Sequence, residues 1–229
     1  LIPFEGRFEL RKANFRDLVS LDLAPVDGVV FDLGLSSPQL ESSGRGFSFQ
    51  QPDEPLDMRF DPDSAGPTAA ELLNELSGPE LEHVFRTYGE EPRARRLART
   101  VAQRRARQPL ERTADLVAAV TAALGPARGR IHPATRAFQA LRIAVNDEVA
   151  SLEAGLDASI DLLNVGGRLA VISFHSLEDR IVKWRLRGWA EEGRATIHTR
   201  KPITPSTEEV QRNPRARSAK LRIAERLAA

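Results

Sequence analysis

The sequence predicts an α/β fold in which a sheet-bearing domain is interrupted by an all-helical domain. Two short apolar runs, Val29–Leu33 and Arg168–Phe174, consist of β-favouring residues, and each leads into a polar loop. The long stretch between them contains mainly helical patterns, which is typical of an inserted helical domain. We therefore expect residues 1–62 and 132–229 to form the sheet-bearing domain and residues 63–131 to form the inserted one.

The chain opens on residues 7–12 (RFELRK), in which apolar and polar residues alternate as they do in a strand. Doubly wound domains normally open with a strand and a glycine-rich loop that binds phosphate or nucleoside groups. The opening residues contain no such loop. We therefore expect a further βαβ unit to precede Leu1 in the full-length protein.

Asp32 stands near the end of the first apolar run, directly before a loop that contains Gly34, Ser36, Ser37 and Pro38. In open α/β sheets, ligands bind in the crevice outside the carboxyl ends of the strands. The position of Asp32 therefore predicts that this carboxylate and the loop after it form one wall of a ligand site. The alternative is that Asp32 only caps the loop.

The long segment 34–66 is rich in serine, glycine, proline and aspartate, but it also carries several large apolar residues. A flexible linker would not carry so many of them. We therefore expect a packed loop with a functional role. The large apolar residues are Phe47, Phe49, Leu56, Met58 and Phe60.

Helix starts in the middle of the chain are marked by local signals. Thr68 with Glu71, and Ser77 with Glu80, match capping boxes, in which a hydroxyl and a carboxylate satisfy the free amides of a first turn. Further helices are expected at Pro92–Arg107, which is rich in arginine, and from a cap at Thr113 to Leu124.

The last third of the chain returns to the α/β pattern. Apolar residues spaced by threes and fours from Phe138 to Leu163 predict two consecutive helices that pack on the sheet. Gly166-Gly167 is expected to end them. Ser176 with Asp179 is expected to cap the helix after the second strand, and residues 219–225 (AKLRIAE) are expected to form a last strand.

The composition narrows the class of protein. No cysteine is present, which excludes disulfides and thiolate metal sites and favours a reducing, cytoplasmic location. No apolar run approaches the length of a membrane span, and the scattered histidines predict no structural metal. The net charge is only +1, but residues 86–112 carry nine arginines against three glutamates. Such a segment suits a polyanion such as nucleic acid, and a solvated arginine face is the alternative.

A resemblance to a known family is carried by five stretches: FDLGLSSPQL (31–40), RGFSF with PLDMRFD (45–49 and 55–61), HPATRAFQALRIAVNDE (132–148), ISFHSLEDRIVK (172–183) and NPRARSAKLRIAER (213–226). They resemble, in register over almost the whole chain, the bacterial small-subunit ribosomal RNA (cytosine-N4)-methyltransferase family. The resemblance implies a Rossmann-like class I methyltransferase fold, interrupted by a helical substrate-recognition domain. It also implies S-adenosyl-L-methionine as cofactor and a cytidine in the decoding region as substrate.

The resemblance assigns cofactor contacts to Phe15, Asp32 and Gln39. It implies that Phe15 packs on the adenine and that Asp32 and Gln39 hydrogen-bond polar groups of the cofactor. The family also has a Gly-Gly-His-Ser loop and an acidic residue that binds the cofactor ribose. Both would lie upstream of Leu1, so this chain departs from the family pattern by their absence.

The expected reaction requires a hydrogen-bond acceptor beside the substrate amine. The N4 amine of cytosine is a poor nucleophile, and holding it in line with the methyl–sulfonium bond supplies part of the rate enhancement. Ser36 and Ser37 occupy the place where nucleic-acid amino-methylases often carry such an acceptor, so we predict a catalytic role for them. His175, just past the second strand, is a further catalytic candidate or a structural histidine.

The loop and the basic residues offer candidate contacts to RNA. A flipped-out base needs an aromatic or apolar surface on which to stack. Either this surface is provided by Phe47, Phe49 and Phe60, or these residues are buried anchors of the loop. Asn146 is expected to hydrogen-bond from its helix to a loop. Four arginines are predicted to bind RNA phosphates or, alternatively, to pair with nearby aspartates; they are Arg45, Arg59, Arg215 and Arg217.

The expected partner is small-subunit ribosomal RNA or the assembled small ribosomal subunit, with no membrane and with a possible homodimer. Three alternatives remain open at this point. The first is a non-catalytic RNA-binding module on a methyltransferase-like scaffold. The second is a nucleotide-dependent oxidoreductase, and the third is a methyltransferase that acts on DNA instead of RNA.

Overall fold

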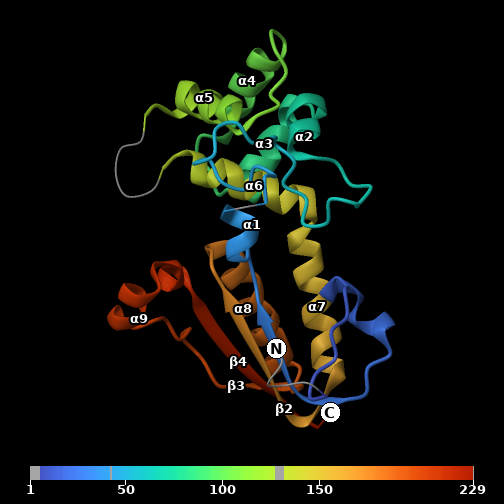
Figure 1. Ribbon diagram of the computed structural model, residues 1–229. Helices are drawn as coiled ribbons and strands as arrows, with labels where there is room; N and C mark the ends of the chain where they lie inside the picture. The colour runs from blue at the N-terminus through green and yellow to red at the C-terminus, as the bar shows by residue number, and fades with distance from the viewer. Residues whose placement is uncertain (1–5, 42, 127–131, 229) are drawn as a thin grey trace. The chain divides into compact units, whose positions relative to one another are not determined.

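The computed structural model describes residues 6–41, 43–126 and 132–228 and divides into two compact units (Figure 1). Unit 1 comprises residues 1–34 and 149–229, and unit 2 comprises residues 35–148. In the described part of the chain, no helix is both long and apolar enough to cross a membrane.

Unit 1 is an α/β unit built on one mixed sheet. Its elements in chain order are the 3₁₀ helix η2 (Phe15–Leu21), β1 (Val26–Asp32), α7 (Glu148–Leu162), β2 (Leu163–Ser173), α8 (Ser176–Glu191), β3 (Ala195–Ile197), α9 (Thr207–Arg212), the 3₁₀ helix η3 (Pro214–Ser218) and β4 (Lys220–Arg226).

The sheet has the strand order β1-β2-β4-β3. β1 pairs parallel with β2, while β4 runs antiparallel to both β2 and β3. The register places Asp32 opposite Ile172, so the carboxyl ends of the two strands predicted first are direct neighbours. The prediction of a last strand at residues 219–225 is also confirmed, because β4 covers Lys220–Arg226.

One face of this sheet carries the core of unit 1. Side chains alternate along a strand, so Leu169 and Val171 point to the same face, and both are buried. Apolar residues from α7 and α8 join them in one cluster: Leu152, Leu156 and Ile160 from α7, and Val182, Leu186 and Trp189 from α8. On the opposite face Val30 stays 69% exposed.

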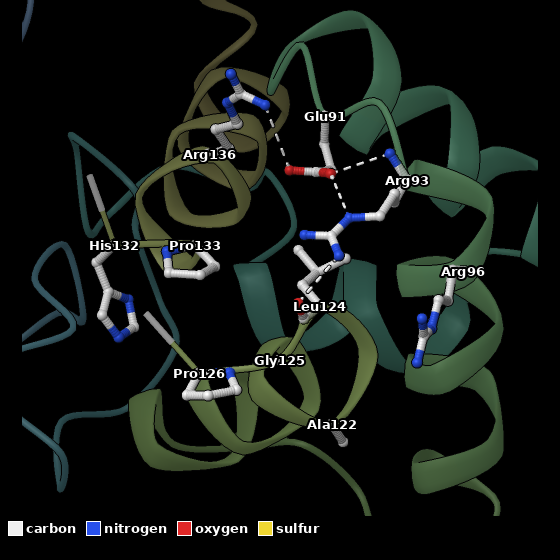
Figure 2. A pocket seen from close by; sticks show the side chains of 10 residues that line it. All are labelled: Glu91, Arg93, Arg96, Ala122, Leu124, Gly125, Pro126, His132, Pro133 and Arg136. Atoms are coloured by element: carbon white, nitrogen blue, oxygen red, sulfur yellow. Dashed lines mark hydrogen bonds and ion pairs between the residues drawn. The ribbon is translucent and has the colours of Figure 1, made fainter. Parts of the chain in front are cut away.

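Unit 2 is helical. Its elements are α1 (Ser37–Glu41), α2 (Ala69–Glu75), α3 (Gly78–Thr87), α4 (Ala94–Arg105), α5 (Thr113–Leu124) and α6 (Ala134–Asn146). The two predicted capping boxes are confirmed: the Thr68 and Ser77 side chains each accept the amide of the glutamate three residues on, which in turn accepts the cap amide. A polar pocket of about 540 Å³ opens among the ends of α4, α5 and α6 (Figure 2).

The compact helical unit is wider than the predicted segment 63–131. It begins at residue 35 because the buried loop residues Phe47, Leu56 and Met58 pack in the same core as the helices. It ends at residue 148 because α6 contributes Phe138 and its neighbours to that core. The long apolar pattern was therefore correctly predicted as two helices, of which α6 contributes to the core of unit 2 and α7 to the core on the sheet of unit 1.

Two predictions about backbone structure are wrong. Residues 7–12 form no strand, and Leu10 is 83% exposed. Alternation alone does not make a strand, because the ladder needs a partner, and these residues pair with no strand in the described part of the chain. Gly166-Gly167 does not end a helix but lies inside β2. The pairing register with β1 shifts between Val26 and Gly28, opposite these glycines.

Two predicted helix caps are displaced by one residue. The N-cap of α5 is Arg112, whose amide donates to the Asp115 carboxylate, while the Thr113 hydroxyl donates to the Gln51 carbonyl. The N-cap of α8 is His175, paired with Glu178, and not Ser176 with Asp179. At α8 the His175 imidazole replaces the predicted hydroxyl as acceptor, and at α5 the Asp115 carboxylate satisfies the backbone amide of Arg112.

Candidate functional site

Asp32 ends β1 at the edge of the sheet where the loop begins. The Leu33 amide still donates to the Ile172 carbonyl at 3.0 Å, and Gly34 then turns the chain with φ +95°. A Cβ atom at Gly34 would lie 3.4 Å from the Phe174 ring, so the turn is tight as well as left-handed. The exposed Asp32 carboxylate makes no hydrogen bond or ion pair with any residue that the structure describes. It is therefore available to a ligand.

Phe15 opens η2 and is held against the core of unit 1. Its ring lies 5.2 Å from the Phe31 ring, at an interplanar angle of 51°. A Cβ atom at Gly155 would lie only 2.6 Å from a Phe15 ring carbon, so α7 accepts this ring because the residue there is glycine. Side chains alternate along β1, so Asp32 points to the opposite face from Phe31, against which Phe15 packs.

His175 is built into the start of α8. Its Nδ1 accepts the Glu178 amide at 3.3 Å, and Glu178 Oε2 accepts the amides of Phe174 at 2.8 Å and His175 at 3.3 Å. Its Nε2 lies 3.0 Å from Glu178 Oε1. These contacts favour the structural interpretation of His175, and its catalytic role stays a prediction.

Asp179 ties the first turn of α8 to β4, a role that the sequence analysis missed. Its carboxylate accepts from Lys220 Nζ at 3.0 Å and from Arg222 Nε at 2.7 Å, and the Arg222 side chain is buried. Burial alone would raise the pKa of Asp179, but the hydrogen bonds from Arg222 and Lys220 outweigh it and hold the pKa below its ordinary value.

Ser36 and Gln39, predicted for different roles, bind each other within unit 2. Gln39 Oε1 accepts from the Ser36 amide at 3.0 Å and from the Ser36 hydroxyl at 2.9 Å. The backbone amide of Gln39 donates in return to Ser36 Oγ at 3.4 Å. Ser37 is the first residue of α1, and its side chain lies outside the described part of the chain. Ser36 and Gln39 thus form one hydrogen-bonded turn at the start of a helix.

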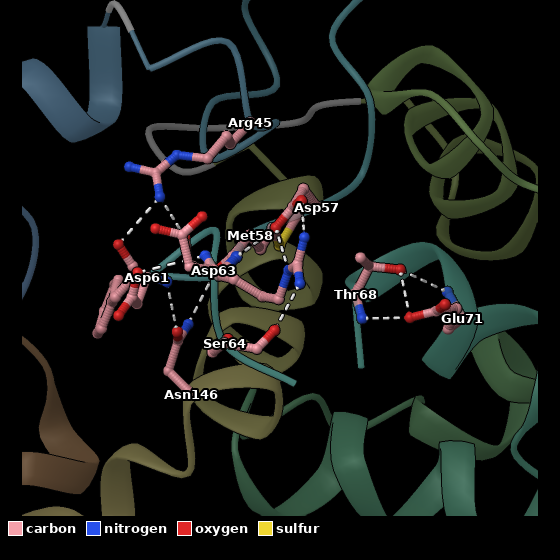
Figure 3. Close-up of polar contacts among 11 residues, drawn as sticks. Arg45, Asp57, Met58, Asp61, Asp63, Ser64, Thr68, Glu71 and Asn146 are labelled. Atoms are coloured by element: carbon pink, nitrogen blue, oxygen red, sulfur yellow. Dashed lines mark hydrogen bonds and ion pairs between the residues drawn. The ribbon is translucent and has the colours of Figure 1, made fainter. Parts of the chain in front are cut away.

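Arg45 and Arg59 stabilise the loop within unit 2 (Figure 3). Arg59 donates to both carboxylate oxygens of Asp57, at 2.9 and 2.8 Å, and to the Ser64 carbonyl at 2.8 Å. The hydrogen bond from Arg59 lowers the pKa of Asp57 and raises that of Arg59. Arg45 donates to the carbonyls of Arg59 and Phe60, at 2.6 and 3.0 Å. RNA binding by Arg45 and Arg59 stays a prediction, as it does for the exposed Arg215 and Arg217 in η3.

Asn146, at the end of α6, makes the predicted hydrogen bonds from helix to loop (Figure 3). Its Oδ1 accepts the Phe60 amide at 2.7 Å, and its Nδ2 donates to the Met58 carbonyl at 2.8 Å. Met58 is fully buried and has φ +60°, a conformation that costs free energy for a residue other than glycine. The Asn146 side chain is thus one of the contacts that hold this strained segment in place.

The three loop phenylalanines act as anchors in this structure. Phe47 is buried and stacks on Phe60, with ring centroids 5.9 Å apart. Phe49 stacks on His132 at 4.8 Å and meets Phe138 edge to face at 5.7 Å. The anchor interpretation is therefore confirmed for Phe47, and the other two rings also pack against the helical core.

Comparison with known proteins gives consistent matches. The model of the family described as "MraW methylase family" matches residues 1–227. The "Ribosomal RNA small subunit methyltransferase H" of Thermomicrobium roseum is 51% identical in an alignment 244 positions long, which covers 98% of this chain and 74% of that protein. The protein of the same name from Persephonella marina is 48% identical, with 99% of this chain and 78% of that protein covered. The one from Synechococcus sp. (strain JA-2-3B'a(2-13)) is 53% identical, with 96% and 67% covered.

Proposed function

The chain belongs to the MraW methylase family, a family of S-adenosylmethionine-dependent methyltransferases, and from this premise we propose that its methyl acceptor is the N4 amine of a cytidine in small-subunit ribosomal RNA. The names of these relatives support the ribosomal RNA of the small subunit as substrate. The single structural observation that supports a ligand site is the unpaired Asp32 carboxylate at the carboxyl end of β1, beside the end of β2.

The residues assigned to the cofactor fit its chemistry. The free Asp32 carboxylate can accept hydrogen bonds from the amine or hydroxyl groups of S-adenosylmethionine. The half-buried Phe15 ring offers an apolar surface to the adenine. Gln39 uses its Oε1 for Ser36, and its Nε2 donates to no residue that the structure describes, so two donors remain for a ligand. The cofactor supplies the methyl group, and the proposed role of these side chains is to bind and orient the cofactor.

The Ser36 hydroxyl is the proposed acceptor for the substrate amine. An amine held by an acceptor keeps its lone pair directed at the methyl group, and charge that develops on nitrogen is stabilised. The predicted segment 63–131, which lies within unit 2, is the proposed substrate-recognition domain. Its excess of arginine suits the phosphates of ribosomal RNA or of the assembled small subunit.

Asp32→Asn in the full-length protein tests the cofactor site. We expect the affinity for S-adenosylmethionine, measured by calorimetry, to fall at least about tenfold, because a neutral amide accepts a weaker hydrogen bond. Asp27→Asn is the matched control, since Asp27 is an exposed residue at the other end of β1. Wild-type affinity in Asp32→Asn, or an equal loss in both variants, would refute the assignment.

The reaction itself is tested on small-subunit RNA and on assembled subunits with wild-type protein. Nucleoside mass spectrometry is expected to find N4-methylcytidine, and methylation of a ring carbon would contradict the proposal. Replacing Ser36 and Ser37 together by alanine is expected to abolish transfer while cofactor affinity is retained. Wild-type turnover in that double variant would remove the serines from the mechanism. RNA binding without any cofactor binding would favour the non-catalytic alternative.

A further inference from the structure

We propose that the polar pocket of unit 2, defined by Glu91, Arg93, Arg96, His132 and Arg136, binds a backbone phosphate of the RNA substrate. This inference rests on the proposed function and assigns one contact of that substrate. The pocket has a volume of about 540 Å³ (Figure 2). All of its lining residues that the structure describes lie within residues 35–148, so they belong to one compact unit.

Among the lining residues that the structure describes, three arginines accompany one carboxylate. Glu91 is only 5% exposed, and its carboxylate lies 3.8 Å from Arg93 Nε and 3.6 Å from Arg136 Nη1. Figure 2 shows Arg93 and Arg136 on two sides of Glu91. Because one negative charge faces three positive ones, the pocket keeps a surplus of positive charge that an anion would neutralise.

Two of the arginines are oriented in advance. Arg93 donates to the Leu124 carbonyl at 3.0 Å, and its own amide donates to Glu91 Oε1 at 3.0 Å. The long contact between Arg136 and Glu91 steadies the guanidinium without using all of its donors, since the Arg136 side chain is 46% exposed. A guanidinium held in this way loses little conformational entropy when it binds a phosphate in its planar fork.

Arg96 is the arginine of the pocket whose N–H donors are available to a ligand. Its guanidinium makes no ion pair and no hydrogen bond with any side chain or carbonyl in residues 6–41, 43–126 and 132–228. It lies in the first turn of α4, a helix whose first turn contains no acidic residue. The first turn of α6, which also borders the pocket, has none either. The positive ends of both helix dipoles therefore add to the charge of the arginines.

His132 supplies a further donor. Its Nδ1 accepts the Ala134 amide at 3.1 Å, so Nε2 is the ring nitrogen left to donate. The ring is fixed by stacking on Phe49 at 4.8 Å. Guanidinium, imidazole and helix-terminal donors around one small cavity are the groups that recognise a phosphodiester, and they carry no information about base sequence. The pocket would therefore position the RNA and would not select the target cytidine.

Arg96→Gln in the full-length protein tests this assignment against Arg104→Gln. Arg104 is another exposed arginine on the same helix and does not line the pocket. We expect Arg96→Gln to weaken binding to small-subunit RNA roughly tenfold at physiological salt and to reduce the slope of log K against log salt by about 0.7 to 0.9. Arg104→Gln is expected to leave both within about twofold of wild type.

Steady-state methylation adds a readout that a folding defect would not give. We expect KM for the RNA to rise in Arg96→Gln while kcat and the affinity for S-adenosylmethionine stay at the wild-type value. Equal losses in both variants would show a diffuse basic surface and overturn the pocket, as would wild-type RNA affinity in Arg96→Gln. Failure of the proposed function is distinguishable, because wild-type protein would then not methylate small-subunit RNA at all.

Discussion

Asn146→Ala is expected to loosen the loop of unit 2 without unfolding the helices. The side chain makes two hydrogen bonds to this loop, with the Phe60 amide and the Met58 carbonyl. A typical intramolecular hydrogen bond contributes about 0.5–1.5 kcal/mol net, so the loss of two amounts to about 1–3 kcal/mol. Met58 stays in its strained conformation only while such contacts hold it. In Asn146→Ala, only the remaining contacts of the loop hold Met58 in this conformation.

Native-state hydrogen exchange measures this effect at the site where it arises. If local opening of the loop becomes easier by about 1–3 kcal/mol, the Phe60 amide exchanges about 5 to 150 times faster, since 1.4 kcal/mol corresponds to tenfold. Amides in the middle of α3 and α5 are expected to keep their protection. A global melting curve would be less informative, because two compact units need not unfold in one transition.

Asn74→Ala is the matched control for this experiment. Asn74 also bridges a helix to a loop, with its Nδ2 donating to the Leu110 carbonyl at 3.0 Å and its Oδ1 accepting the Leu110 amide at 3.0 Å. Its loss is expected to speed exchange at Leu110 and not at Phe60. Unchanged exchange at Phe60 in Asn146→Ala, or the same acceleration in Asn74→Ala, would refute the reasoning.

Two further predictions concern stability. Because the folded-state pKa of Asp179 is lowered, its pairing with Lys220 and Arg222 stabilises unit 1 above the unfolded-state pKa of about 3.9 and is lost as the pH falls below that value. Urea midpoints measured from pH 3 to 7 are expected to show a weaker pH dependence in Asp179→Asn than in wild type, and parallel curves would contradict the linkage. Gly46→Ala is expected to destabilise unit 2 by about 2 kcal/mol or more, because φ is +74° and the new Cβ would lie 2.3 Å from the Pro55 carbonyl oxygen. Gly44→Ala, with φ +67° and open space around the Cβ, is expected to cost less in the same urea titration; equal costs would contradict the steric argument.

The sequence predicted the features that depend on a few neighbouring residues. The capping boxes at Thr68 and Ser77 are local, because each joins residues three apart on one turn. The burial of Phe47 followed from its size, since a large aromatic ring in a polar segment is stable only against a core. The bonds of Asn146 join residues 86 and 88 positions apart, so the sequence predicted a contact from helix to loop but not its partners Phe60 and Met58.

Three of the missed features depend on groups distant in the sequence, whereas the two displaced helix caps at Arg112 and His175 do not. Residues 7–12 have the alternation of a strand, but a strand exists only beside another strand, and alternation does not name the partner. The boundary of unit 2 was placed where helical periodicity starts, whereas the core includes irregular residues such as Leu56 and Met58. The role of Asp179 could not be predicted either, because Lys220 and Arg222 lie more than 40 residues further along the chain.

The contact between Ser36 and Gln39 changes what each residue offers to the proposed reaction. A hydroxyl has one proton and two lone pairs. The Ser36 hydroxyl donates its proton to Gln39 Oε1, and one of its lone pairs accepts a hydrogen bond from the backbone amide of Gln39. What remains is a single acceptor position, which can bind the N–H of an amine but cannot donate to the amine's lone pair. The Gln39 side chain would therefore contribute in two ways, by leaving its Nε2 protons for the cofactor and by fixing Ser36 in the polarity that methyl transfer to a nitrogen requires.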